Sequence, residues 1–139
     1  MSEYQDWNQK IIAEFRASGG QVGGQFAGAP LLLLTTTGAK SRQKRTTPVM
    51  YLSDGDDIAI FASKAGAPTN PDWYHNILAN PRATVEVGTE TYDVDTKVTE
   101  PAERDRLYDI QAERYPGFAG YAEKTTRVIP VVVLERISS

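Results

Sequence analysis

Short apolar and β-branched stretches, separated by turn-forming residues, constrain the fold of this chain more than any other feature. Six of them follow the first 30 residues, and the expected strands are 31–36, 46–53, 58–63, 84–87, 91–98 and 129–136. Two connections carry tight-turn signals, Asp54–Asp57 and Gly88-Thr89. A doubly wound parallel sheet would need regular alternation of strand and helix, which the sequence lacks. We therefore expect an α+β fold, a small antiparallel barrel with flanking helices.

Helical patterns occur near the start, the middle and the end of the chain. One face of an expected helix over 3–17 is apolar, with Tyr4, Trp7, Ile11, Ile12 and Phe15. A second helix is expected to run to about Ala79, with Asn70 as its cap and Pro71 in its first turn. Thr99 is expected to cap a third helix through about Arg114, and a short helical segment is expected near 118–124. We expect residues 1–30 to form an N-terminal helix and Gly-rich loop, and 31–139 to form the barrel domain.

Composition excludes several classes of protein. The 139 residues suffice for one domain with its own core, and they include no cysteine and one histidine, His75. Disulfides, thiolate nucleophiles and metal sites built from cysteine or several histidines are therefore excluded. A net charge of −3 disfavours general binding to nucleic acid. Neither a secretory pattern nor an apolar run of membrane-spanning length is found, so we expect a cytoplasmic protein.

A cluster of positive charge stands out in this acidic chain. Four of the six residues from 40 to 45 are basic, namely Lys40, Arg42, Lys44 and Arg45. Like charges held together repel one another, so an anionic ligand is the expected reason for the cluster. Lysine supplies a mobile point charge, and arginine supplies a planar fork for phosphate or carboxylate oxygens. Gly38 permits a tight turn, although the pattern is not a Walker P-loop. The alternative is a solvated loop.

Two further segments suit a flat ligand. Small residues from 62 to 69 allow the backbone to approach a ring that Trp73 would cover, although a core tryptophan is an alternative. Tyr115, Phe118 and Tyr121 recur every three residues, and they either line an apolar pocket or seal the end of the barrel. The sequence offers no nucleophile–base pair, so in an enzyme a cofactor would carry the reactivity.

Motifs at 37–48, 62–66, 70–76, 79–81 and 129–133 occur together and in this order. Over roughly residues 31–136 the chain resembles the deazaflavin-dependent nitroreductase family of actinobacteria. The resemblance implies a split β-barrel that binds coenzyme F420, a deazaflavin with a phosphate and an oligoglutamate tail. This anionic tail would account for the basic cluster, with Lys40 and Arg45 at the phosphate region.

The resemblance also implies which residues bind the cofactor. On the basic segment and the strand after it, they are Ala39, Lys40, Ser41, Arg42, Arg45, Thr46, Thr47, Pro48, Val49 and Met50. Around the second motif, they are Phe61, Ala62, Ser63, Lys64, Ala65 and Gly66. At the helix start, they are Asp72, Trp73, Tyr74, His75 and Asn76. Taken without the resemblance, His75 suits a structural role.

Reduced F420 would then pass a hydride to a planar acceptor stacked on it, with Tyr115 and Tyr121 as catalytic residues. The proton would come from a tyrosine hydroxyl or water. The expected acceptor pocket consists of Met50, Trp73, Tyr115, Phe118 and Tyr121. Phe118 and Met50 stand where nitroimidazole-activating members carry a tyrosine and another aromatic residue. The pocket therefore has fewer hydroxyls, which favours quinones or enones, with other nitroaromatics still open.

Other interpretations of the sequence stay open. One is an FMN-dependent split-barrel oxidoreductase, whose ligand has a single phosphate, and another is a non-catalytic F420 carrier. The chain is expected to be a monomer or a homodimer. The 3–17 helix carries three acids against two bases, which disfavours anionic lipid. We expect it to pack on the barrel or cover the pocket, and weak peripheral membrane association is the alternative.

Overall fold

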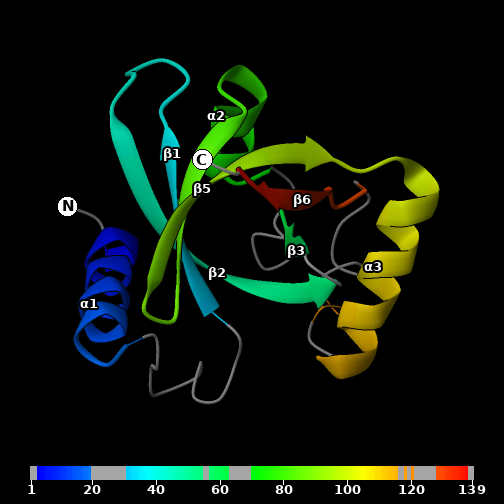
Figure 1. Cartoon of the computed structure of the whole chain (residues 1–139), viewed down its shortest axis with the longest axis horizontal. Coiled ribbons are helices and arrows are strands. Elements are labelled where there is room, and N and C mark those ends of the chain that lie inside the picture. Colours follow the sequence, from blue (N-terminus) through cyan, green and yellow to red (C-terminus); the bar gives the residue numbers. More distant parts are fainter. Residues whose placement is uncertain are drawn as a thin grey trace.

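Six strands close into one antiparallel barrel (Figure 1). The computed structural model describes residues 3–19, 31–54, 57–62, 70–115, 118, 120 and 128–137. The strands are β1 (Leu31–Thr37), β2 (Lys44–Asp54), β3 (Asp57–Phe61), β4 (Arg82–Val87), β5 (Glu90–Val98) and β6 (Val131–Arg136). Around the barrel their order is β1-β2-β3-β6-β5-β4. The helices are α1 (Glu3–Ala17), α2 (Asp72–Ala79) and α3 (Pro101–Arg114). The expected α+β barrel is confirmed.

The run of four leucines in β1 fills two different cores. Leu32 and Leu34 are fully buried in the interior of the barrel, where Val85 of β4 lies opposite Leu34. Successive side chains of a strand point to opposite faces, so Leu31 and Leu33 face outward. Both of these are also buried, because a helix covers them. β1 is therefore apolar on both faces, which explains why its sequence does not alternate.

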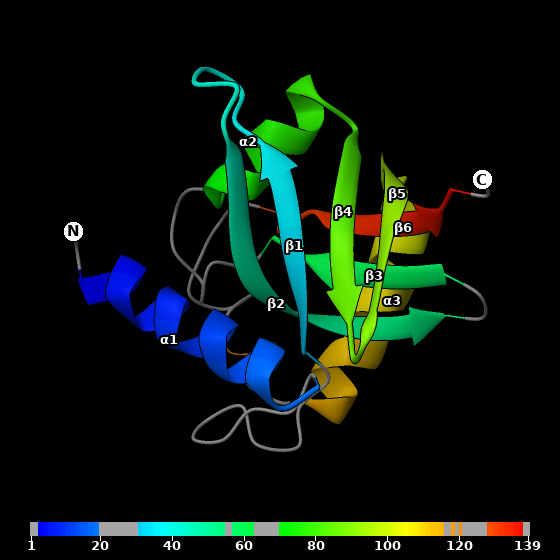
Figure 2. The same ribbon diagram turned by 60° about the vertical axis from the view of Figure 1, so that its left-hand side comes forward.

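α1 is the helix that covers this outer face, and it crosses β1 and β2 (Figure 2). Three of its apolar residues, Ile11, Ile12 and Phe15, are buried against Leu31, Leu33 and the partly buried Met50. The predicted apolar face of the helix is thus used in packing on the barrel, at least over its second half.

α3 and α2 cover other parts of the barrel (Figures 1 and 2). α3 buries Leu107 and Tyr108 in a second outer cluster, which includes Phe61 of β3. α2 lies at one end and places Trp73 and Ile77 in the interior cluster. No helix in the described ranges is long and apolar enough to cross a membrane.

Two strands begin two residues before their predicted starts, whereas β6 begins two residues after its predicted start, at Val131 and not at 129. β2 begins at Lys44 and not at 46, and β4 begins at Arg82 and not at 84. In both cases the backbone ladder continues beyond the apolar residues, to the pairs Thr37–Lys44 and Arg82–Asp95. Backbone pairing does not require apolar side chains, so the hydrophobic pattern underestimates the strands.

Both predicted helix caps are wrong. α2 begins at Asp72, and Pro71 occupies the cap position without a side-chain hydrogen bond, so Asn70 is not the cap. α3 follows Glu100, and the hydroxyl of Thr99 donates to the carbonyl oxygen of Val131 at 2.9 Å. Thr99 therefore joins the helix start to β6. The expected loop up to residue 30 and helical segment at 118–124 lie largely outside the described residues.

Candidate cofactor and acceptor site

Residues 38–43, here called the basic turn, connect β1 to β2 and are closed by their own hydrogen bonds. The amide of Gly38 donates to the carbonyl oxygen of Gln43 at 2.8 Å, and the amide of Arg42 donates to Gly38 O at 3.0 Å. The amide of Gln43 also donates to Ser41 Oγ at 3.2 Å. Arg42 has a φ of 59°, a left-handed conformation that is uncommon for residues other than glycine. These contacts give the turn a defined shape.

Gly38 leaves room for the Ser41 hydroxyl in this turn. A Cβ atom at this position would lie 2.4 Å from Ser41 Oγ and 3.3 Å from Gln43 O. The first distance is far inside van der Waals contact, so a side chain would displace the hydroxyl that accepts from Gln43.

The positive charges on and beside the basic turn are not neutralised by the fold. Lys40, Arg42, Lys44 and Arg45 are all exposed, and within the described part of the chain none of them forms an ion pair. By contrast, Lys97 pairs with Glu135 at 2.7 Å. Four unpaired cations within six residues create a local positive potential that favours a polyanion.

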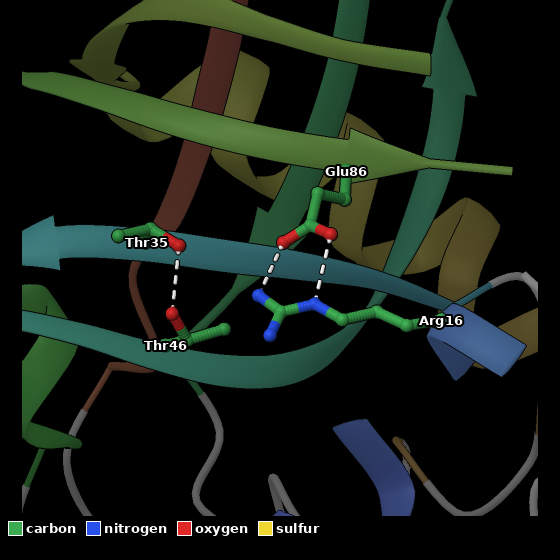
Figure 3. Close-up of polar contacts among 4 residues, drawn as sticks. All are labelled: Arg16, Thr35, Thr46 and Glu86. Carbon is green, nitrogen blue, oxygen red and sulfur yellow. Dashed lines mark hydrogen bonds and ion pairs between the residues drawn. The ribbon is translucent and has the colours of Figure 1, made fainter. Parts of the chain in front are cut away.

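The strand pairing distributes these cations over both faces of the β1–β2 ladder. Arg45 lies opposite Thr36, which is buried on the interior side, whereas Lys44 lies opposite Thr37 on the outer side. Thr46, which was expected at the cofactor, shares a 2.8 Å hydrogen bond between hydroxyl oxygens with Thr35 on the outer side (Figure 3).

Asn76 on α2 holds the basic turn from outside the hairpin. Its Oδ1 accepts from the amide of Ala39 at 3.0 Å, and its Nδ2 donates to Thr36 Oγ1 at 3.0 Å. The side chain is only 9% exposed. Asn76 and Ala39 were both predicted to contact the cofactor. In the structure, the Asn76 carboxamide and the Ala39 amide form hydrogen bonds within the protein.

The outer face of β2 connects the clusters under α1 and α3. Met50 is partly buried and packs against both of them, as expected for a residue on the floor between the two helices. Pro48 and Thr46 continue this face toward the basic turn. Thr47 and Val49 point to the other face, where Val49 packs against the interior cluster.

Of the residues predicted to line the acceptor pocket, Phe118 is packed into an aromatic cluster with two other rings. Phe61, Tyr108 and Phe118 form edge-to-face contacts, with ring centroids 5.6 to 6.3 Å apart. The Tyr108 hydroxyl donates to Phe118 O at 2.5 Å, and Phe118 is 7% exposed. Tyr115 lies half-buried at the edge of this cluster. Phe118 therefore packs beneath α3, and the pocket roles of Met50 and Tyr115 stay predictions.

Gln111 on α3 was not expected from the sequence. It is fully buried, and within the described part of the chain neither its Oε1 nor its Nε2 has a hydrogen-bond partner. Its burial could have been predicted from its position one helical turn after Leu107 and Tyr108, on the face that packs against the barrel.

The other predicted site residues are placed as follows. Trp73 is buried in the interior of the barrel, Tyr74 is half-buried, and Asp72 and His75 are exposed on α2. Ala62 is buried and donates its amide to Pro130 O at 2.9 Å. The remaining predicted residues lie outside the described ranges, namely Ser63, Lys64, Ala65, Gly66 and Tyr121.

An ion pair links α1 to β4, beside the outer face of β1 and β2. Arg16 Nε and Nη2 contact Glu86 Oε1 and Oε2 at 3.0 and 2.9 Å (Figure 3). This bidentate geometry, with Glu86 as hydrogen-bond acceptor, raises the pKa of Arg16. The pair ties α1 to β4, next to the Thr35–Thr46 contact.

The chain is similar to several known proteins. The model of the F420H(2)-dependent quinone reductase family matches residues 7–136. An F420H(2)-dependent quinone reductase of Mycobacterium tuberculosis is 44% identical over 128 residues, covering 89% of this chain and 86% of the relative.

Two solved structures are also similar. An F420-H2 dependent reductase superposes with a TM-score of 0.70 at 41% identity, covering 76% of this chain and 94% of the other. A structure described as a domain-swapped dimer gives a TM-score of 0.72 at 36% identity, covering 96% of this chain and 100% of the other.

Proposed function

Because the chain belongs to the F420H2-dependent quinone reductase family, we propose that its basic turn binds the anionic tail of F420. The observation that carries the proposal is the set of four exposed cations without ion-pair partners among the described residues. A phosphate followed by several carboxylates offers the matching charges. Lys40 and Arg42 lie on the turn itself, and Arg45 and Lys44 extend the positive surface along β2.

The proposed place of the acceptor is the outer face of β2, between α1 and α3. Met50 supplies an apolar floor there, and Tyr115 lies at the edge of the α3 cluster. When bound, reduced F420 supplies a hydride, and the protein holds the acceptor against it. We assign the accompanying proton to the hydroxyl of Tyr115 or Tyr121. Quinones are the leading acceptors, followed by planar enones and nitroaromatics.

We also propose that residues 31–139 form the cofactor-binding unit and that 1–30 flank the acceptor. α1 covers Met50 from one side, which supports this division. A homodimer is proposed as the working assembly, since one similar structure is described as a domain-swapped dimer. Light scattering on the purified chain tests this assembly directly.

Titration with F420 tests the basic turn. We expect Lys40→Ala combined with Arg45→Ala to weaken binding at least about a hundredfold, since two charge-assisted contacts of about 1.5–3 kcal/mol each are lost. Lys97→Ala serves as the control, because Lys97 is an exposed cation on β5 that already pairs with Glu135. Unchanged F420 affinity in the double variant would contradict the proposal. Oxidation of F420H2 by menadione then tests the quinone activity.

A further inference from the structure

We infer that Asn76 is a positioning residue, which sets the orientation of the basic turn toward the tail of F420 without contacting the cofactor itself. The inference rests on the proposed function. It concerns a buried carboxamide on α2, whose two polar ends each bond to a different part of the β1–turn segment.

The first step of the argument is the link between α2 and the turn. Among the described residues, the hydrogen bond from the Ala39 amide to Asn76 Oδ1 joins the turn to an element outside the β1–β2 hairpin. Within the described ranges, all the other hydrogen bonds of residues 38–43 stay within the turn. Ala39 immediately precedes Lys40, so this bond restrains the backbone that carries the first cation.

The second step is the fixed orientation of the carboxamide. Thr36 is 2% exposed, and its hydroxyl accepts from Asn76 Nδ2 at 3.0 Å. The Ala39 N–H can only donate, so it fixes Oδ1 as the end of the amide that faces the turn. The Thr36 hydroxyl then accepts from Nδ2 and holds the carboxamide in this place. Thr36 thus acts on the turn through Asn76.

The third step is the anchoring of α2. Trp73 and Ile77 lie in the interior cluster of the barrel, on the same buried face as Asn76. The helix is therefore held by apolar packing, and Asn76 transfers that fixed position to an otherwise exposed turn. A preorganised turn binds a flexible anionic tail more tightly, because less freedom is lost on binding.

The test compares the affinity for F420 with the affinity for its deazaflavin riboside, which lacks the phosphate and glutamates. We expect Asn76→Ala to weaken F420 binding about fivefold to tenfold, the equivalent of one hydrogen bond. Binding of the riboside should stay unchanged, because it does not reach the turn. Thr36→Val should reproduce most of the loss, Thr36→Ser should restore it, and Thr36→Val with Asn76→Ala should be no weaker than Asn76→Ala alone.

Ile77→Val is the matched control. Ile77 is 2% exposed on the same helix face, and its truncation lowers stability modestly without removing a bond to the turn. We expect the control to bind F420 like the wild type. Equal losses for F420 and the riboside in Asn76→Ala, or wild-type F420 affinity in that variant, would overturn the inference. Failure of the wild type to bind F420 would instead overturn the proposed function.

Discussion

Replacing Gln111 by methionine should stabilise the protein. Gln111 is fully buried, and both polar atoms of its carboxamide lack a hydrogen-bond partner among the described residues. Burying an unpaired polar group costs about 1–3 kcal/mol in mutational series. Methionine keeps an unbranched side chain of similar length and volume, so the packing around this position should change little. The expected balance is a gain of about 1–2 kcal/mol in the free energy of unfolding.

Urea denaturation followed by circular dichroism measures this gain by linear extrapolation. The same change should raise Tm by roughly 3–8 °C in a domain of this size. Glu113→Met, on the exposed face of the same helix, is the control and should stay within about 0.5 kcal/mol of the wild type. Gln111→Glu should be destabilising at neutral pH, because it adds a buried charge.

A loss of stability in Gln111→Met would refute the reasoning. It would mean that the carboxamide is satisfied in solution, for example by a buried water with several polar partners. In that case the polar atoms would contribute to folding, and the position would be part of a hydrated internal site.

Two further predictions concern the basic turn and β5. Gly38→Ala should weaken F420 binding, because the new Cβ would meet Ser41 Oγ at 2.4 Å, and adding Ser41→Ala should recover part of the affinity in the same titration. On β5, burial raises the pKa of Tyr92 above its ordinary value of 10.0, against the lowering effect of Arg136. The folded state therefore holds this proton more tightly than the unfolded state, so stability should fall as the pH rises above about 10. Urea titrations at several pH values should show a shallower decline for Tyr92→Phe, and identical slopes would contradict this assignment.

The strands of this barrel were predictable because their signals are local. The leucine run of β1 and the turn after Val87 identify elements without knowledge of their neighbours. The cap of α3 was not predictable in this way. Thr99 has the right side chain for a cap, but its hydroxyl bonds to Val131, which is 32 residues away. Only the barrel register brings these two residues together.

The candidate site, like the fold, combines features that were predictable from the sequence with features that were not. The charge of the basic turn is visible in the sequence, and its exposure follows from the charge. The role of Asn76 was not visible, because its partners Thr36 and Ala39 lie 40 and 37 residues away. The resemblance placed Asn76 at the cofactor, whereas the geometry uses its side chain to join two elements. The sequence left two roles open for Trp73, a core residue or a ligand contact. Its burial within the barrel agrees with the core role.

The strand order has a consequence for how the chain folds during synthesis. β6 is the last of the described strands, yet it lies between β3 and β5 and pairs with both. Until it is made, the earlier strands can form at most an open sheet in the order β5-β4-β1-β2-β3, with two unpaired edges. Exposed edges are templates for aggregation. At about 5–20 residues per second, the ribosome needs several seconds to pass from the end of β5 to the end of β6. The nascent chain is therefore most exposed to misassembly in this interval, and α3 is synthesised within it.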